Sequence, residues 1–292
     1  MSPVLQDVKS APVDSLAEKS GSEEPKRQFC WRCGRDLPRE GDYCDRCGVR
    51  QCVPTGIKGL DALLLGGFEE GKTYLVSGQT GSGKTVFCMQ YLACGLSKGE
   101  SSVYVTTDQK PDHLLAEALG FGWDFRNSIE KGKLMLLDLS AEFSKEETRK
   151  GVGPARAIEE LRPYIERVSA KRLAIDSLAS LFSVLENKQK IGEEIRRALF
   201  ALDEFGTTNV VTSFVKPGSN ALSLFGVEEL LASGVIVLKL LRRGAKYERH
   251  MEILKMRTTP YVPAIRKFTI EKEVGIVVGP EVNAKEVAEQ RT

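Results

Sequence analysis

Eight consecutive residues of this sequence have the types and spacing of a loop that binds phosphate groups. They follow the pattern Gly-x-x-x-x-Gly-Lys-Thr and comprise Gly78, Gln79, Thr80, Gly81, Ser82, Gly83, Lys84 and Thr85. The glycines let the backbone curl so that successive N–H groups point at phosphate oxygens. Lys84 is expected to reach the β- and γ-phosphates of a nucleotide, and the Thr85 hydroxyl is expected to bind Mg²⁺.

The residues on both sides of this loop have the patterns that such a site requires. Residues 73–77 resemble a buried strand, and residues 84–96 place apolar side chains at helical spacing without a proline. A helix that begins at the loop adds the positive end of its dipole to the phosphate site. A glycine-rich turn without function is the alternative interpretation, and the flanking strand and helix favour the phosphate site over it.

Four of the seven cysteines form two Cys-x-x-Cys pairs within residues 28–51. The pairs are Cys30 with Cys33 and Cys44 with Cys47, and ten residues separate them. Each pair presents two thiolates from one tight turn, which favours a tetrahedral Zn²⁺ site and resembles a zinc ribbon. A module of this size has almost no apolar core, so zinc is expected to supply its folding free energy. A redox or catalytic role is the less favoured alternative, because all four ligand positions are filled.

The composition of the whole chain restricts the classes of function. Its 292 residues include 42 basic and 40 acidic side chains, so bulk charge gives no argument for binding nucleic acid or a membrane. No apolar run approaches the roughly 18 residues that would cross a bilayer. The first 20 residues mix charges of both signs without an apolar segment, unlike a signal peptide. The expected location is therefore cytoplasmic, where reducing conditions favour metal-bound over disulfide-bonded cysteines.

The patterning divides the chain into four parts. Residues 1–27 are polar and are expected to be a disordered tail, followed by the zinc ribbon at 28–51. Residues 52–280 alternate apolar strand-like runs with helical segments, which predicts an α/β domain whose mainly parallel sheet is covered on both faces. A helix is expected over 155–168, and the last strands are expected to extend the sheet in antiparallel fashion. Residues 281–292 are expected to be a flexible tail.

Several separated motifs together resemble the KaiC-type ATPases of the RecA superfamily. Besides the phosphate-binding loop they are Thr-Gly-Ile-x-Gly-Leu-Asp at 55–61, Ile-Asp-Ser-Leu at 175–178, Gly-Val-Ile-Val-Leu at 234–238 and Leu-Lys-Met-Arg at 254–257. One departure is Ser233, where the family commonly has Asp. The resemblance implies a RecA-like P-loop NTPase core that binds ATP and Mg²⁺ and forms a homo-oligomer, with a hexamer as the family form.

The resemblance also implies roles for residues outside the loop. Asp176 matches the acid that holds Mg²⁺, usually through water, and its place at the end of an apolar strand agrees with that role. Lys255 and Arg257 match a basic pair that reaches the γ-phosphate bound by a neighbouring subunit. Their spacing puts both residues on one face of a strand. Two ordinary surface cations are the alternative interpretation of this pair.

The residues that follow the second predicted strand depart from the family. KaiC-type ATPases usually have paired glutamates there, which position or activate the attacking water, whereas this chain has Asp108 and Gln109. Asp is shorter than Glu by a methylene, and a misplacement of about 1 Å can lower a rate on the order of 100-fold. Gln cannot act as a base, although it can orient a water. We therefore expect secure nucleotide binding and slow hydrolysis.

These features favour a Mg²⁺-dependent ATP-binding protein with slow ATPase activity that acts as a nucleotide-switched oligomeric regulator or scaffold. The zinc ribbon or the tails would then present a surface to a protein partner. An alternative is a DNA-repair ATPase similar to the bacterial RadA proteins, which would bind single-stranded DNA. The loop at 216–220 gives that alternative little support, because it has one cation and no aromatic side chain for base stacking. A further alternative is a module that holds ATP without turning it over.

Overall fold

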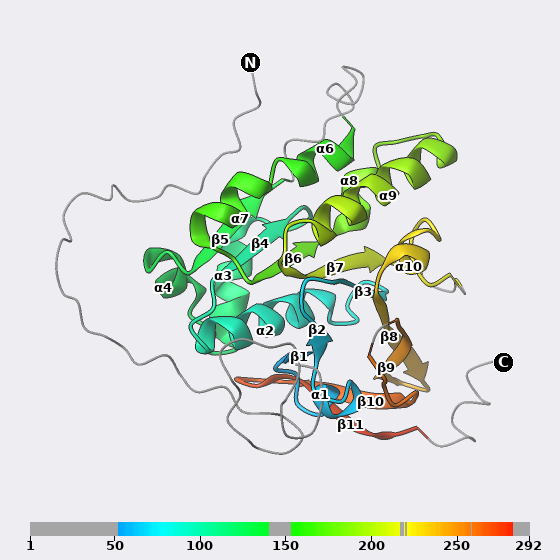
Figure 1. Cartoon of the computed structure of the whole chain (residues 1–292). Helices are drawn as coiled ribbons and strands as arrows, with labels where there is room; N and C mark the ends of the chain where they lie inside the picture. Colours follow the sequence, from blue (N-terminus) through cyan, green and yellow to red (C-terminus); the bar gives the residue numbers. More distant parts are fainter. Residues whose placement is uncertain (1–51, 140–152, 217–218, 220, 258, 283–292) are drawn as a thin grey trace.

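The computed structural model describes residues 52–139, 153–216, 219, 221–257 and 259–282 (Figure 1). The predicted N-terminal tail and the predicted zinc ribbon lie outside the described residues, and with them Cys30, Cys33, Cys44 and Cys47. Most of the predicted C-terminal tail also lies outside them. These parts of the domain division therefore stay predictions, and nearly all described residues belong to the core predicted over 52–280.

Nine described strands form one sheet at the centre of the core. They are β3 (Thr73–Gly78), β4 (Ser102–Thr106), β5 (Leu134–Asp138), β6 (Arg172–Asp176), β7 (Thr208–Phe214), β8 (Gly234–Arg243), β9 (Lys246–Met256), β10 (Ile265–Glu271) and β11 (Gly275–Glu281). Their order across the sheet is β11–β10–β9–β8–β3–β7–β6–β4–β5. A separate ribbon pairs β1 (Cys52–Val53) with β2 (Phe68–Glu69). The prediction of an α/β fold with a largely parallel sheet is confirmed.

The parallel part of the sheet gathers its strand ends at one edge. From β8 to β5 all neighbouring strands are parallel, and β3 lies between β7 and β8. Gly78, the last residue of β3, pairs with Phe214 of β7, and Thr106 of β4 pairs with Asp176 of β6. Because the carboxyl ends of parallel strands meet at one edge, the phosphate-binding loop and Asp176 come close together.

Helices cover both faces of the sheet (Figure 1). They are α1 (Leu60–Leu63), α2 (Lys84–Ser97), α3 (Pro111–Gly120), α4 (Phe125–Glu130), α6 (Pro154–Glu159), α7 (Arg162–Val168), α8 (Leu178–Phe182), α9 (Lys188–Asp203) and α10 (Glu228–Leu231). One face packs against α1–α4 and the other against α6–α9, and each face has its own cluster of buried apolar side chains. None of the described helices is long and apolar enough to cross a membrane.

The C-terminal strands extend the sheet and curve beneath α2, as Figure 1 shows. β8 is parallel to β3 and antiparallel to β9, and β10 and β11 continue the antiparallel pattern, so the predicted extension is confirmed. Gln90 of α2 fastens this layer, because its side-chain amide donates to the Ile276 carbonyl at 3.3 Å and accepts from the Ile276 N–H at 2.7 Å. The curvature brings Arg249 of β9 and Ile270 of β10 beside the phosphate-binding loop.

The helix predicted over 155–168 is wrong, because the structure has two helices there, α6 and α7. The break falls at Glu160 and Leu161, and Pro163 occupies the first turn of α7. Proline has no N–H to donate to the preceding turn and disfavours helical backbone at the residue before it. It therefore begins a new helix in place of continuing the first one.

Candidate functional site

The loop from Gly78 to Thr85 joins β3 to α2 in a conformation that depends on its glycines. Gly81 and Gly83 have φ of 78° and 106°, in the left-handed region that side chains rarely adopt. A Cβ at Gly78 would lie 2.2 Å from the carbonyl oxygen of Leu238, so only glycine fits between β3 and β8. The backbone of the loop is therefore bare of side chains where a phosphate chain would approach it.

The remaining side chains of the loop divide between its surface and the core. Thr80 is exposed at the tip, whereas Ser82 is buried, with no hydrogen-bond partner for its hydroxyl among the residues that the structure describes. The carbonyl oxygen of Gln79 accepts a hydrogen bond from the N–H of Ser82 at 3.2 Å. This turn gives the loop its curled shape.

Lys84 lies across the loop at the first position of α2. Its Nζ donates hydrogen bonds to the carbonyl oxygens of Gly78 at 2.9 Å and Gln79 at 3.0 Å. Burial lowers the pKa of Lys84, and the nearby charge of Asp176 acts in the opposite direction. A polyphosphate on the loop would favour the charged ammonium further, because opposite charges at short range stabilise each other.

Asp176, at the end of β6, gathers three hydroxyl groups around its carboxylate. Oδ2 accepts from Thr85 at 2.6 Å and from Tyr104 at 3.1 Å, and Oδ1 accepts from Thr212 at 2.6 Å. Burial, followed by the charge of Asp176, raises the pKa of Tyr104 well above its usual value, so the phenol remains a donor. A carboxylate beside a threonine hydroxyl offers the hard oxygen ligands that suit Mg²⁺, directly or through water.

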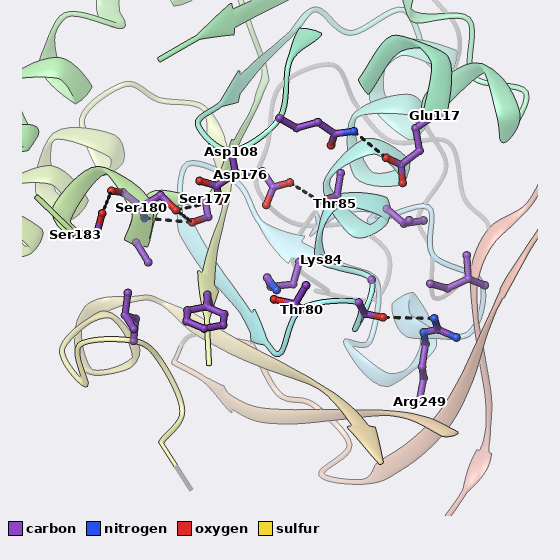
Figure 2. A pocket seen from close by; sticks show the side chains of 18 of the residues that line it. Thr80, Lys84, Thr85, Asp108, Glu117, Asp176, Ser177, Ser180, Ser183 and Arg249 are labelled. Atoms are coloured by element: carbon purple, nitrogen blue, oxygen red, sulfur yellow. Dashed lines mark hydrogen bonds between the residues drawn. The ribbon is translucent and has the colours of Figure 1, made fainter. Parts of the chain in front are cut away.

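A cavity of about 1000 Å³ opens beside these residues (Figure 2). Its walls come from the phosphate-binding loop, the segment after β4, α3, α8, and the strands β9 and β10. The charged and amide side chains on the walls are Lys84, Asp108, Gln109, Glu117, Asp176 and Arg249. Phe121 and Ile270 add apolar surface. The cavity thus combines a few convergent polar groups with apolar walls, as small-molecule sites commonly do.

Asp108 and Gln109 both line this cavity, and Thr107 separates them from the end of β4. Ser180 of α8 donates its hydroxyl hydrogen bond to Asp108 Oδ2 at 2.9 Å. The side-chain amide of Gln109 donates through Nε2 to Glu117 Oε2 at 3.2 Å. The structure therefore adds Ser180 and Glu117 to the site, and neither was expected from the sequence pattern.

Lys255 and Arg257 lie together, but not on the cavity walls of their own chain. Lys255 Nζ donates to the carbonyl oxygens of Glu229 at 2.8 Å and Leu230 at 3.2 Å, and Arg257 donates to the same Leu230 oxygen at 2.5 Å. Both cations therefore cap the carbonyl end of α10, which attracts positive charge. Burial, followed by the charge of Arg257, lowers the pKa of Lys255. The predicted basic pair is thus a real cluster, and its role toward a neighbouring subunit stays a prediction.

Sequence reasoning missed Arg249, which lies on β9 at the edge of the cavity (Figure 2). Its guanidinium donates to the carbonyl oxygen of Gly81 at 3.4 Å. Its Nε is buried without a hydrogen-bond partner within the described part of the chain. A guanidinium in this position can donate to a phosphate or to another acceptor of a bound ligand. Only the sheet order reveals it, because β9 is remote from the loop in sequence.

The arrangement defines a class of fold. A strand–loop–helix unit carries the phosphate-binding loop, and an acid faces that loop from β6, which β7 separates from β3 in the sheet. The parallel strands at the centre and the antiparallel strands at the C-terminal side complete a RecA-like P-loop core.

Residues 53–283 match the family model described as "ATPase: KaiC", so the chain belongs to the KaiC family of ATPases. The circadian clock oscillator protein KaiC of Thermostichus vulcanus is 33% identical over 225 residues, which cover 77% of this chain and 43% of that protein. The KaiC protein of Synechococcus elongatus is 33% identical over 217 residues, or 74% of this chain and 42% of that protein. The chain therefore spans less than half the length of these curated relatives.

A solved structure has a similar fold over most of the chain. It is a KaiC-like protein from the hyperthermophilic archaeon Pyrococcus horikoshii OT3, 35% identical to this chain, with a TM-score of 0.69. The match covers 79% of this chain and 99% of the archaeal chain. The RecA-like core that the sequence motifs predict is thereby confirmed.

Proposed function

We propose that the chain binds ATP together with Mg²⁺, hydrolyses it slowly, and uses the bound nucleotide to control how copies of the chain assemble. The observation that carries this proposal is the hydrogen bond of 2.6 Å between Thr85 and Asp176, within the cavity that Lys84 also lines. The Lys84 cation and the oxygen atoms of Thr85 and Asp176, which can bind Mg²⁺, therefore lie together at one phosphate-binding loop. Membership of the KaiC ATPase family supports the same function.

Each residue of the site has a proposed role in holding the nucleotide. Backbone N–H groups of the loop bind phosphate oxygens, and Lys84 exchanges its bonds to loop carbonyls for the β- and γ-phosphates. Thr85 and Asp176 hold Mg²⁺, which when bound neutralises charge on the phosphates. Tyr104 and Thr212 fix the carboxylate of Asp176 through their hydroxyl groups.

Hydrolysis is proposed to be slow because Asp108, the acid beside the phosphate site, has a short side chain that is already hydrogen-bonded to another residue. The carboxylate of Asp108 already accepts a hydrogen bond from Ser180. Gln109 can orient a water molecule through its amide oxygen but cannot take the proton from it. The site therefore retains the means to hold ATP while lacking an efficient base for the attacking water.

The assembly is proposed to place Lys255 and Arg257 at the nucleotide of a neighbouring copy. Both cations bind the carbonyl oxygen of Leu230, a residue that is 64% exposed, so the pair lies at the surface where a second copy can reach it. Cations that reach a γ-phosphate across an interface would couple the nucleotide state to packing between copies. The resemblance to KaiC-type ATPases favours a ring of six copies. Separately, the predicted zinc ribbon or the tails are proposed to bind a protein partner.

Native mass spectrometry of the full chain with Mg²⁺-ATP, with Mg²⁺-ADP and without nucleotide tests this proposal. We expect an oligomer that requires Mg²⁺-ATP and retains about one nucleotide per copy. The Lys84→Ala variant should retain no nucleotide and should stay unassembled. A wild-type chain that stays monomeric in saturating Mg²⁺-ATP, or that retains no nucleotide, would contradict the proposal.

A DNA-repair function similar to that of RadA is the second candidate, and the two Cys-x-x-Cys pairs are the observation that favours it. It predicts that single-stranded DNA stimulates ATP hydrolysis and that the binding constant falls steeply as salt concentration rises. The regulator or scaffold function predicts no effect of DNA on the rate. Hydrolysis assays with and without single-stranded DNA at two salt concentrations therefore separate the two functions.

A further inference from the structure

We propose that Glu117 of α3 is a positioning residue for hydrolysis, which holds the side-chain amide of Gln109 so that its oxygen can orient the attacking water. This proposal rests on the proposed function, because it concerns ATP in the same cavity. Both side chains line that cavity, and Gln109 Nε2 lies 3.2 Å from Glu117 Oε2. Figure 2 shows Glu117 on the wall of the cavity with this hydrogen bond drawn.

The chemistry of the two groups determines which end of the amide faces Glu117. A carboxylate has only acceptor atoms, so the Gln109 NH₂ group must be the partner. The amide oxygen of Gln109 is then turned away from Glu117 and is left to accept a hydrogen bond. A hydrogen bond to a charged acceptor is roughly twice as strong as one between neutral groups, so Glu117 favours this orientation strongly.

The backbone of Gln109 is held independently of its side chain. Thr106 Oγ1 donates to the Gln109 carbonyl oxygen at 2.7 Å and accepts from the Gln109 N–H at 3.3 Å. With both backbone groups fixed, the side-chain torsions are the freedom that remains, and Glu117 restricts them. The helix that carries Glu117 is anchored, because Leu114, Leu115 and Ala118 of α3 are buried in the core.

The neighbouring residue is held from the other side of the cavity. Asp108 accepts from Ser180 of α8, whereas Gln109 donates to Glu117 of α3. Asp108 and Gln109 are therefore fixed by separate helices. Glu117 also brings a full-length carboxylate to the wall where Asp108 and Gln109 offer only a short acid and a neutral amide. The pair Gln109–Glu117 thus supplies an amide oxygen for the water and a charge that keeps this oxygen in place.

The test is single-turnover hydrolysis of bound ATP, together with nucleotide affinity, in the full chain. Glu117→Ala should lower the hydrolysis rate about 10- to 100-fold, the scale expected when a reacting group is misplaced by about 1 Å, and should change affinity less than about threefold. Asp112→Asn is the matched control, since this exposed carboxylate of α3 pairs only weakly with Arg126 in solvent. It should leave both quantities unchanged.

Exchanging the Gln109 amide and the Glu117 carboxylate provides a stricter test, which does not depend on whether the Glu117→Ala variant folds. Gln109→Glu alone places two carboxylates within hydrogen-bond distance, so they share a proton and the rate should rise with pH more steeply than in the wild type. Combining Gln109→Glu with Glu117→Gln restores an amide–carboxylate pair. The double variant should recover at least the wild-type rate and lose the added pH dependence.

The outcomes distinguish this proposal from the function on which it rests. A wild-type chain that hydrolyses ATP while Glu117→Ala does so at the same rate would overturn the role of Glu117 and leave the proposed function intact. A double variant that retains ATP affinity but hydrolyses ATP more slowly than the wild type would overturn the role of Glu117 as well. A wild-type chain that binds no ATP would overturn both proposals together.

Discussion

The hydroxyl of Thr85 and the carboxylate of Asp176 lie 2.6 Å apart although 91 positions separate them in the sequence. The contact joins the first turn of α2 to the end of β6. Thr212 of β7 binds the second carboxylate oxygen at the same distance. The phosphate-binding loop and the acid are thus one unit, built from three adjacent parts of the parallel sheet, and the consequences of breaking that unit can be measured.

Replacing Asp176 by Asn should remove the dependence of ATP affinity on Mg²⁺. The amide keeps the size of the side chain but loses the charge that attracts the ion, and loss of such a group typically costs about 10- to 100-fold in metal affinity. Fluorescence titration with a labelled ATP, with Mg²⁺ and with EDTA, measures the effect. Asp112→Asn, which changes an exposed carboxylate of α3 outside the site, is the control and should keep the full Mg²⁺ response. A full Mg²⁺ response in Asp176→Asn would exclude the proposed metal site.

Lengthening Asp108 to Glu should accelerate hydrolysis. The added methylene moves the carboxylate further into the cavity, where a shift of about 1 Å can change a rate on the order of 100-fold. Single-turnover assays should show an increase of about 10-fold with little change in ATP affinity. A chain that binds ATP but shows no turnover as wild type or as Asp108→Glu would instead be a module that holds ATP without turning it over.

The bond between Ser180 and Asp108 allows a companion measurement. Ser180→Ala removes the hydroxyl that holds Oδ2 at 2.9 Å and frees the carboxylate to turn. If the restraint contributes to slow turnover, the rate should change in Ser180→Ala but much less in the Asp108→Glu background, because the two changes act on one group. Equal effects in both backgrounds would show that Ser180 acts elsewhere.

Mixing two inactive variants should restore activity if the nucleotide site is shared between copies. Lys84→Ala removes the cation of the phosphate-binding loop, and Arg257→Ala removes a cation whose loss can cost about 10³- to 10⁵-fold in rate. Lys84→Ala alone should not assemble, but the intact loops of the Arg257→Ala copies still bind Mg²⁺-ATP and allow an equal mixture to assemble. About a quarter of the interfaces in that oligomer would combine an intact loop with an intact Arg257. Steady-state ATP hydrolysis after joint assembly measures the recovery.

The control for that experiment mixes each variant with a chain that carries both substitutions. In such a mixture both chains lack the same group, so no interface can combine an intact loop with an intact Arg257. Recovery in the first mixture alone would assign Lys84 and Arg257 to different copies. Absence of recovery in every mixture would show that Arg257 acts, if at all, within its own chain.

Much of the site could be predicted from sequence because local patterns mark the ends of its elements. The apolar run before Gly78 and the run that ends at Asp176 identify two strands, and parallel pairing then brings their carboxyl ends together. The residues that escaped prediction depend on pairing across the sheet. Tyr104 lies inside β4 and Arg249 inside β9, so their approach to the loop is decided by strand order and curvature rather than by local spacing.

Glu117 escaped for a different reason, since the predicted alternation of strands and helices over 52–280 did not locate a helix after β4. The signal was present, because Pro111 occupies the first turn of α3 and Leu114, Leu115 and Ala118 fall on its buried side. Pro163 was a similar signal, because it lies at the start of α7 and separates α7 from α6 within the single helix that was predicted there. In both places proline begins a helix, and a reading based on apolar spacing alone overlooks that boundary.

Elemental analysis of the purified chain should find about one zinc per copy, because two Cys-x-x-Cys pairs provide four thiolates for one ion. Replacing Cys30 or Cys47 by Ser should abolish zinc retention and unfold the predicted ribbon, since metal binding supplies its folding free energy. Cys52, which lies on β1, is the control, and its replacement by Ser should leave the zinc content unchanged. Zinc retained after loss of Cys30 would refute the predicted ligand set.

Stability against urea should fall as the pH drops below about 6.5, partly because of His250, since an unperturbed histidine titrates near that value. Burial lowers the pKa of His250 in the folded chain, against the opposing effect of Glu248, whose carboxylate lies 3.4 Å from Nε2. The unfolded chain therefore takes up a proton at a pH where folded His250 remains neutral, which favours unfolding. Each unit by which the pKa is lowered corresponds to about 1.4 kcal/mol.

Urea unfolding at pH 7.5 and pH 5.5 measures this contribution in wild type and in His250→Gln. The variant lacks the titrating group, so its free energy of unfolding should fall less between the two pH values than that of the wild type. His113→Gln replaces the other histidine, which is exposed on α3, and should keep the wild-type pH dependence. Because the comparison is between two pH values of one variant, any general loss of stability caused by His250→Gln cancels. An unchanged pH dependence in His250→Gln would show that burial does not hold this histidine neutral.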